Sequence, residues 1–88
     1  MLVQWQWKNE QSWESYAPLL NDMIERSYQN NDTIYEFEIK GKEYYINFAD
    51  SFGLRQVSKS NFKKWRRIRR KVYHWKGIHI KIKYDFNI

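Results

Sequence analysis

The 88-residue sequence contains no cysteine, one proline, three glycines and two histidines. Without cysteine there can be neither a disulfide framework nor a thiolate zinc site, so side-chain packing must stabilise the fold. Gly41, Gly53 and Gly77 are too far apart to form a glycine-rich phosphate loop. The first ten residues lack the apolar segment of a signal peptide, and no apolar run is long enough to span a bilayer. These absences predict a soluble intracellular protein, nuclear or cytoplasmic.

Catalytic side chains are also scarce. His74 and His79 belong to no recognisable catalytic motif, and no carboxylates have catalytic or metal-binding spacing. Glu36 and Glu38 share a predicted strand face, which is typical of the solvated side of a half-buried strand. The sequence therefore predicts a protein that is not an enzyme and that holds neither a cofactor nor a metal.

Aromatic residues, by contrast, are abundant, with five tryptophans, seven tyrosines and five phenylalanines. A chain of this length makes one small domain whose burial is only marginally sufficient for stability. Each aromatic side chain buries a large area, and surplus rings can also stack on a ligand. The composition therefore indicates a compact β-rich core, with some rings left for a binding surface.

Charge is distributed unevenly along the chain. The net charge is +6, but residues 1–54 hold four basic and nine acidic side chains, whereas residues 55–88 hold twelve basic and one acidic. This asymmetry favours a polyanionic partner for the C-terminal part. Nucleic acid, poly(ADP-ribose) and anionic lipid all carry suitable charge, although a membrane partner is not expected.

Period-2 alternation of apolar and polar residues predicts an antiparallel sheet. The predicted strands are residues 2–7, 13–16, 35–39, 43–48, 54–58, 65–72 and 78–86. Residues 35–39 and 43–48 are predicted to form a hairpin, because Lys40, Gly41 and Lys42 between them suit a tight turn. Neither repeats nor a linker interrupt the pattern, so residues 1–88 are predicted to form a single domain.

A helix is predicted at residues 17–28, with Ser15 as its N-cap and Pro18 in its first turn. Its apolar stripe contains Leu20, Ile24 and Tyr28 at spacings of four. The prediction places Leu19, Met23 and Ser27 beside this stripe, and Asn21, Asp22 and Glu25 off it. The stripe should pack on the sheet.

The basic run at residues 63–71, KKWRRIRRK, is the most distinctive segment. On an extended strand, Arg66 and Arg70 share one face with Ile68, and the intervening cations occupy the other. At most half of the basic run can therefore line a single concave site. The cations of the opposite face are Arg67, Arg69 and Lys71, and we expect them to lie on a solvated surface and not in a specific site.

Five segments in this order and spacing resemble the WWE domain family. They are Trp5-Gln6-Trp7, Trp13 with Tyr16, residues 24–28 around Glu25, residues 44–48 and residues 66–70. The resemblance covers about residues 5–70 and leaves 71–88 as a C-terminal extension. It implies an α+β fold, an antiparallel half-barrel sheet with one helix packed on it, to which the extension adds an extra C-terminal strand.

The resemblance also implies a function. WWE domains are non-catalytic modules of ubiquitin ligases and ADP-ribosyltransferases, and several recognise poly(ADP-ribose) through its iso-ADP-ribose unit or a terminal ADP-ribose. Basic residues grip the phosphates and aromatic residues line the adenine pocket. The ligand-binding residues implied here are Trp7, Tyr44, Gln56, Arg66 and Arg70. A monomer is expected.

The family resemblance also implies structural roles for Trp5, Trp13 and Glu25. Gln6 stands where some binding members have an aromatic residue, Asn47 stands where aspartate is common, and residues 49–53 add length before Gln56. These departures leave two alternatives open. One is general binding of RNA or other single-stranded nucleic acid through the basic strand. The other is a protein-interaction module with no small ligand.

Overall fold

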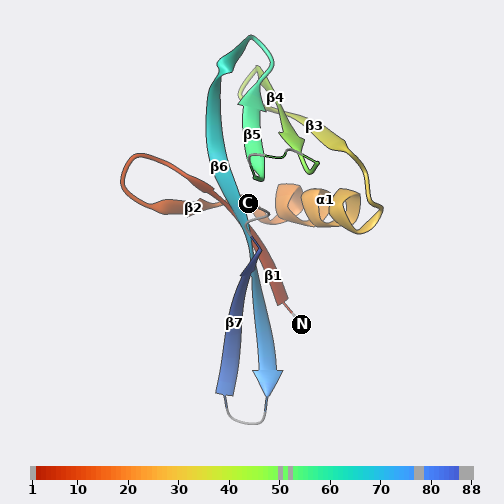
Figure 1. The fold of residues 1–88 in the computed structure, drawn as a ribbon, viewed down its shortest axis with the longest axis vertical. Helices are drawn as coiled ribbons and strands as arrows, with labels where there is room; N and C mark the ends of the chain where they lie inside the picture. Colours follow the sequence, from red (N-terminus) through yellow and green to blue (C-terminus); the bar gives the residue numbers. More distant parts are fainter. Residues whose placement is uncertain (1, 50, 52, 77–78, 86–88) are drawn as a thin grey trace.

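The computed structural model describes residues 2–49, 51, 53–76 and 79–85. One helix packs on an open antiparallel sheet (Figure 1), which confirms the predicted α+β fold with an extra C-terminal strand. In chain order the elements are β1 (Leu2–Lys8), β2 (Trp13–Ser15), α1 (Pro18–Gln29), β3 (Ile34–Ile39), β4 (Lys42–Asn47), β5 (Arg55–Ser58), β6 (Asn61–Lys76) and β7 (His79–Asp85). No helix in these ranges is long and apolar enough to cross a membrane.

Strand β6 organises the sheet, whose order is β2-β1-β6-β5-β4-β3 with β7 also paired to β6. Residues 68–73 of β6 pair with β1, and residues 70–76 pair with β7 on the opposite edge. Strand β5 uses that same edge earlier along β6, pairing with residues 61–67. Figure 1 shows β6 running through the length of the molecule, with β7 beside its second half.

Strand β6 has 16 residues and is longer than the predicted strand at 65–72. It begins directly after the turn at Lys59 and Ser60, and β7 provides pairing partners for its last residues. Pairing with β1 ends at Tyr73, but β7 supplies ladder partners along the other edge as far as Lys76, so β6 continues beyond the predicted end at residue 72. The predicted ends of the final strand, at residues 78 and 86, lie outside the described residues.

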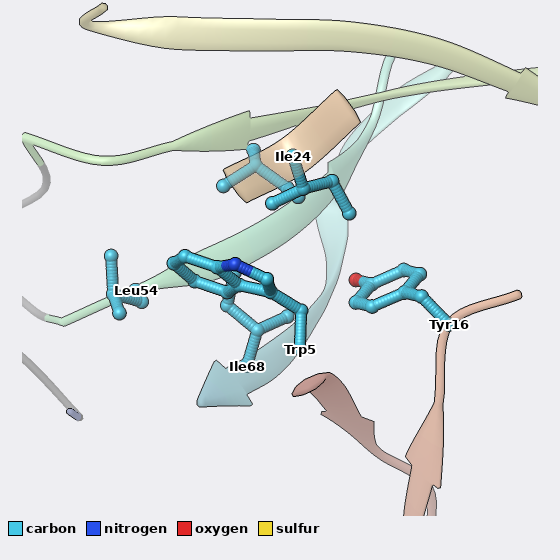
Figure 2. Close-up of a cluster of buried hydrophobic side chains, with 6 residues drawn as sticks. Trp5, Tyr16, Ile24, Leu54 and Ile68 are labelled. Carbon is cyan, nitrogen blue, oxygen red and sulfur yellow. The ribbon is translucent and has the colours of Figure 1, made fainter. Parts of the chain in front are cut away.

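The core lies between α1 and the concave face of the sheet. Trp5 has no solvent-exposed surface, and the Tyr28 and Phe48 rings pack edge-on against it at centroid distances of 5.2 and 5.8 Å. Figure 2 shows how the buried side chains converge from β1, α1, β6 and the segments that follow β2 and precede β5. The core residues are Trp5, Tyr16, Ile24, Ile46, Leu54 and Ile68.

The predicted orientation of the helix was partly wrong. Asn21 is buried together with Ile24 and Ser27, whereas Leu19 is 77% exposed and Met23 is 38% exposed. The predicted stripe of Leu20, Ile24 and Tyr28 does pack against the core, but the buried face of α1 also includes the polar Asn21 in place of Leu19 and Met23. The reason is the edge of β1, whose backbone groups Asn21 satisfies.

Asn21 takes the place of a neighbouring strand. Strand β2 pairs with residues 6–8 of β1, which leaves residues 3–5 of that edge to find other partners. The Trp5 N–H donates to Asn21 Oδ1 at 2.6 Å, and Asn21 Nδ2 donates to the Val3 carbonyl at 2.9 Å. Buried backbone groups need such partners, so the amide ties α1 to β1.

The predicted N-cap was also wrong. Ala17 occupies that position and makes no side-chain capping bond, while Pro18 begins the helix. Ser15 belongs to β2, where its hydroxyl oxygen accepts a hydrogen bond from Gln6 Nε2 at 3.2 Å. Because proline at the first helical position has no N–H to satisfy, the missing side-chain cap costs less here.

Candidate ligand-binding cleft

A cleft of about 1090 Å³ opens beside the core, between the β3–β4 turn and the β5–β6 turn. Four predicted ligand-binding residues line it: Trp7, Tyr44, Gln56 and Arg66. They come from four different strands, β1, β4, β5 and β6. The pairing register explains their convergence, because Arg66 lies opposite Gln56 and the Trp7 partner, Ile68, is two residues further along β6. Residues two apart on a strand share a face.

A hydrogen bond from Tyr16, in the core, holds the Gln56 side chain. The buried Tyr16 hydroxyl donates to Gln56 Oε1 at 2.7 Å, and burial raises the pKa of Tyr16, so the phenol stays protonated. Because the side-chain carbonyl oxygen of Gln56 accepts this hydrogen bond, the NH₂ group of the same amide is left to act as a donor. The amide can therefore donate hydrogen bonds to a ligand in the cleft.

Tyr44 stands at the end of an aromatic series along β3 and β4. Its ring stacks on Phe37 at a centroid distance of 5.7 Å, and Phe37 stacks on Tyr35 at 6.0 Å. The Tyr16 ring meets Phe37 edge-on at 6.1 Å. These contacts fix the Tyr44 ring at the cleft wall, where a fixed ring can stack on a planar ligand group with little loss of side-chain entropy.

The cleft lining is predominantly basic. Five of its side chains are cationic and two are acidic, namely Lys42, Lys59, Lys63, Lys64 and Arg66 against Glu38 and Glu43. Lys59 is already paired with Glu36, at 3.1 Å between Nζ and Oε2, and this hydrogen bond raises the pKa of Lys59. The remaining cations give the cleft a positive potential suited to phosphate groups.

Arg70 does not line the cleft, although it shares a strand face with Arg66. It is only 8% exposed, and its Nε and Nη2 atoms donate to the two Glu25 carboxylate oxygens at 2.9 and 2.8 Å. Helix α1 covers the sheet at Arg70 but not at Arg66. The structure therefore does not bring the predicted binding residue Arg70 into the cleft with Arg66, because its guanidinium pairs with Glu25 of the helix.

A hydrogen bond joins two of the predicted structural residues, Trp5 and Glu25. Trp5 Nε1 donates to Glu25 Oε1 at 2.9 Å, beside the bonds from Arg70. Burial of the carboxylate opposes its ionisation, but hydrogen bonds from Arg70, Gln29 and Trp5 outweigh this effect and lower the pKa of Glu25. The charged network stabilises the contact between β1, β6 and α1.

The model of the WWE domain family matches residues 3–70. The chain belongs to the WWE domain family. A search of curated proteins found no match. WWE domains are generally non-catalytic binding modules for poly(ADP-ribose) and other ADP-ribose-containing ligands, in ubiquitin and ADP-ribosylation pathways. The match includes the four predicted cleft residues and ends within β6, before β7.

Two departures from the family pattern, Gln6 and Asn47, lie outside the cleft lining of this WWE domain. Gln6 accepts a hydrogen bond from Arg69 Nε at 2.7 Å, on the other face of the sheet. Asn47 ends β4, where its Oδ1 accepts from the Ala49 N–H at 3.0 Å. Residues 50 and 52 of the lengthened segment are outside the described residues. The described departures therefore leave the cleft-lining side chains unchanged.

The sequence interpretation missed several residues of this WWE domain's cleft. Lys59, Lys63 and Lys64 surround the β5–β6 turn, and Tyr16 supports Gln56 from the core. The three lysines carry a sequence signal, since they cluster around the turn that precedes Arg66. Tyr16 carries none, because it is 40 residues from Gln56 in the chain.

The third predicted structural residue of the WWE domain, Trp13, lies on the outer face. Its half-buried ring is 4.3 Å from the Arg69 guanidinium carbon, measured to the ring centroid, and 6.0 Å from Lys8 Nζ. It therefore packs against cations on the side of the sheet opposite Trp5.

Proposed function

We propose that this WWE domain binds poly(ADP-ribose), recognising the iso-ADP-ribose unit or a terminal ADP-ribose in the cleft. The observation that carries the proposal is the convergence of Trp7, Tyr44, Gln56 and Arg66 on one basic cleft. The cleft volume of about 1090 Å³ suits a ligand of dinucleotide size, since small-molecule sites are typically about 300–1,000 Å³. Such binding would act within a ubiquitin-ligase or ADP-ribosylation pathway.

Three of the four cleft residues, Arg66, Tyr44 and Gln56, can each supply a distinct interaction. The planar guanidinium of Arg66 can grip phosphate oxygens bidentately, with Lys63 and Lys64 adding charge nearby. The Tyr44 ring can stack on adenine, a contact worth on the order of 1–3 kcal/mol per base. The Gln56 NH₂ group can donate to an acceptor on the base or the sugar. Together these groups match the phosphates, base and sugars of ADP-ribose.

Isothermal titration calorimetry of the 88-residue chain tests this proposal, with iso-ADP-ribose and ADP-ribose as separate ligands. We expect saturable binding of at least one ligand, and a comparison of the two affinities distinguishes internal from terminal recognition. Arg66→Ala should weaken binding at least tenfold, because a bidentate charge-assisted contact is lost. If neither ligand produces heat while circular dichroism shows the native fold, the proposal is wrong.

Arg67→Ala is the matched control. It removes the same charge from the adjacent position of β6, but Arg67 lies on the opposite face and does not line the cleft. We expect it to change the affinity for either ligand less than twofold. Equal losses for Arg66→Ala and Arg67→Ala would show that binding depends on net charge and not on a defined cleft.

A further inference from the structure

The outer face of β6 carries a second concentration of charge. Arg67, Arg69 and Lys71 alternate with the inward-facing residues, and none of them lines the cleft. The rings of Trp13, Tyr73 and Tyr84 lie beside two of these cations, Arg69 and Lys71. We call these six residues the outer patch.

Cation–π contacts join Arg69 and Lys71 of the outer patch to its three rings. The Arg69 guanidinium carbon lies 4.3 Å from the Trp13 ring centroid and 4.4 Å from that of Tyr84. Lys71 Nζ lies 5.1 Å from the Tyr73 centroid and 5.9 Å from that of Tyr84. The Arg69 side chain is further fixed by the bond from its Nε to Gln6. Fixed cations lose less entropy on binding, so Arg69 and Lys71 are preorganised for an anionic ligand.

The charge of the outer patch is not neutralised within the part of the chain that the structure describes. There, neither Arg67, Arg69 nor Lys71 forms an ion pair with an acidic side chain, in contrast to Arg70 with Glu25. Successive cations on one strand face are about 6.8 Å apart, twice the rise per residue. The patch therefore presents a row of positive charge along β6.

The C-terminal extension contributes to this surface. Lys71, Tyr73 and Tyr84 lie beyond the residues that match the family model, and strand pairing sets Tyr84 directly opposite Lys71. Tyr84 remains 40% exposed despite its contacts with two cations. Residues directly opposite each other on paired strands share a face, so Tyr84 of β7 widens the row on β6 into a two-strand surface.

We propose that the outer patch is a second binding site, which takes single-stranded RNA independently of the cleft. Cations in a row match the phosphates of an extended strand, and the exposed Tyr84 ring beside them can stack on an unpaired base. An acidic protein would use the charges but offers no planar base to stack on the Tyr84 ring. Duplex RNA hides its base faces, so it too would use only the charges.

Fluorescence anisotropy with a labelled 15-nucleotide oligouridine tests the proposal. Between 50 and 200 mM salt we expect log affinity to fall with log salt at a slope of about −2, since each of three contacted phosphates contributes about −0.7. Arg67→Gln and Lys71→Gln should each reduce the magnitude of this slope by about 0.7. Tyr84→Ala should weaken binding about fivefold or more without changing the slope.

Arg66→Gln is the matched control, because it removes one charge from the same strand on the cleft side. We expect it to leave RNA affinity within twofold, while Arg67→Gln leaves calorimetric binding of iso-ADP-ribose within twofold. This reciprocal pattern separates the outer patch from the cleft, and the RNA arm stands even if the cleft binds neither ADP-ribose ligand. Circular dichroism establishes that each variant is folded.

Four outcomes would overturn the proposal. No binding of oligouridine at 50 mM salt, or equal loss of RNA affinity in Arg66→Gln and Arg67→Gln, rejects a distinct outer site. Polyglutamate of similar length displacing oligouridine with equal potency would indicate a surface for acidic proteins. Equal affinity for a duplex RNA of the same length would reject recognition of unpaired bases.

Discussion

Arg70 and Glu25 form a bidentate ion pair that joins β6 to α1, with Nε to Oε1 at 2.9 Å and Nη2 to Oε2 at 2.8 Å. The indole N–H of Trp5 donates to the same Oε1 at 2.9 Å. A tryptophan and the glutamate of the family motif therefore meet at one carboxylate, which also receives an arginine of the basic strand. This network holds the helix on one half of the concave face and leaves the cleft on the other.

Glu25→Gln should destabilise the domain. The substitution preserves the shape of the side chain but leaves the buried Arg70 guanidinium without its counter-charge. Breaking a buried ion pair typically costs about 3–5 kcal/mol, and we expect the low end because the Glu25 side chain keeps 21% of its surface exposed. Urea unfolding at pH 7 measures the loss. Asp22→Asn, at an exposed position of the same helix, should change stability by less than about 0.5 kcal/mol.

The same carboxylate should make stability depend on pH. The pKa of Glu25 is lowered in the folded state, so its contribution is fully present above the unfolded-state pKa of about 4.3. That contribution is lost as the pH falls through the folded-state pKa. Unfolding free energies of the wild type and Glu25→Gln, measured at pH 7, 5, 4 and 3, should therefore converge at the acidic end. A constant difference across this range would contradict the ionic role of Glu25.

Asn21→Leu should weaken the attachment of α1 to β1. It leaves the Trp5 N–H and the Val3 carbonyl without the partners that Asn21 provides, at a cost of about 1–3 kcal/mol for each unsatisfied buried group. Urea unfolding measures the change, and hydrogen exchange at the Trp5 amide should become faster. Leu19→Ala in the same helix should have little effect, because Leu19 is 77% exposed. A larger loss in Leu19→Ala than in Asn21→Leu would contradict the observed helix orientation.

Tyr16→Phe should reduce ligand affinity without removing any side chain from the cleft wall. The variant loses the hydrogen bond to Gln56 Oε1, so the amide is no longer held in one orientation. We expect about 1 kcal/mol of lost stability and a several-fold weaker affinity for iso-ADP-ribose in calorimetry. Tyr45→Phe is the matched control, because Tyr45 lies in β4, the strand paired with the one that holds Gln56, and is outside the cleft lining. Unchanged affinity in Tyr16→Phe would show that Gln56 needs no support from the core.

Much of the fold could be predicted from local sequence patterns. Alternation in the hairpin around Gly41 and in the basic run correctly located β3, β4 and the centre of β6, because a strand with one buried face must repeat every two residues. The orientation of α1 could not be predicted in this way. Its buried face includes the polar Asn21, which belongs there because β1 presents unpaired backbone groups.

The sequence by itself determined the family, the strand faces and the presence of one basic strand with two differently occupied sides. It could not distinguish Arg66 from Arg70, which lie four residues apart on the same face. Only the tertiary structure decided that one lines the cleft and the other pairs with Glu25. The reason is that the position of α1 across the sheet depends on long-range contacts of its residues Asn21 and Glu25 with Trp5, and these contacts leave no periodic signal along β6.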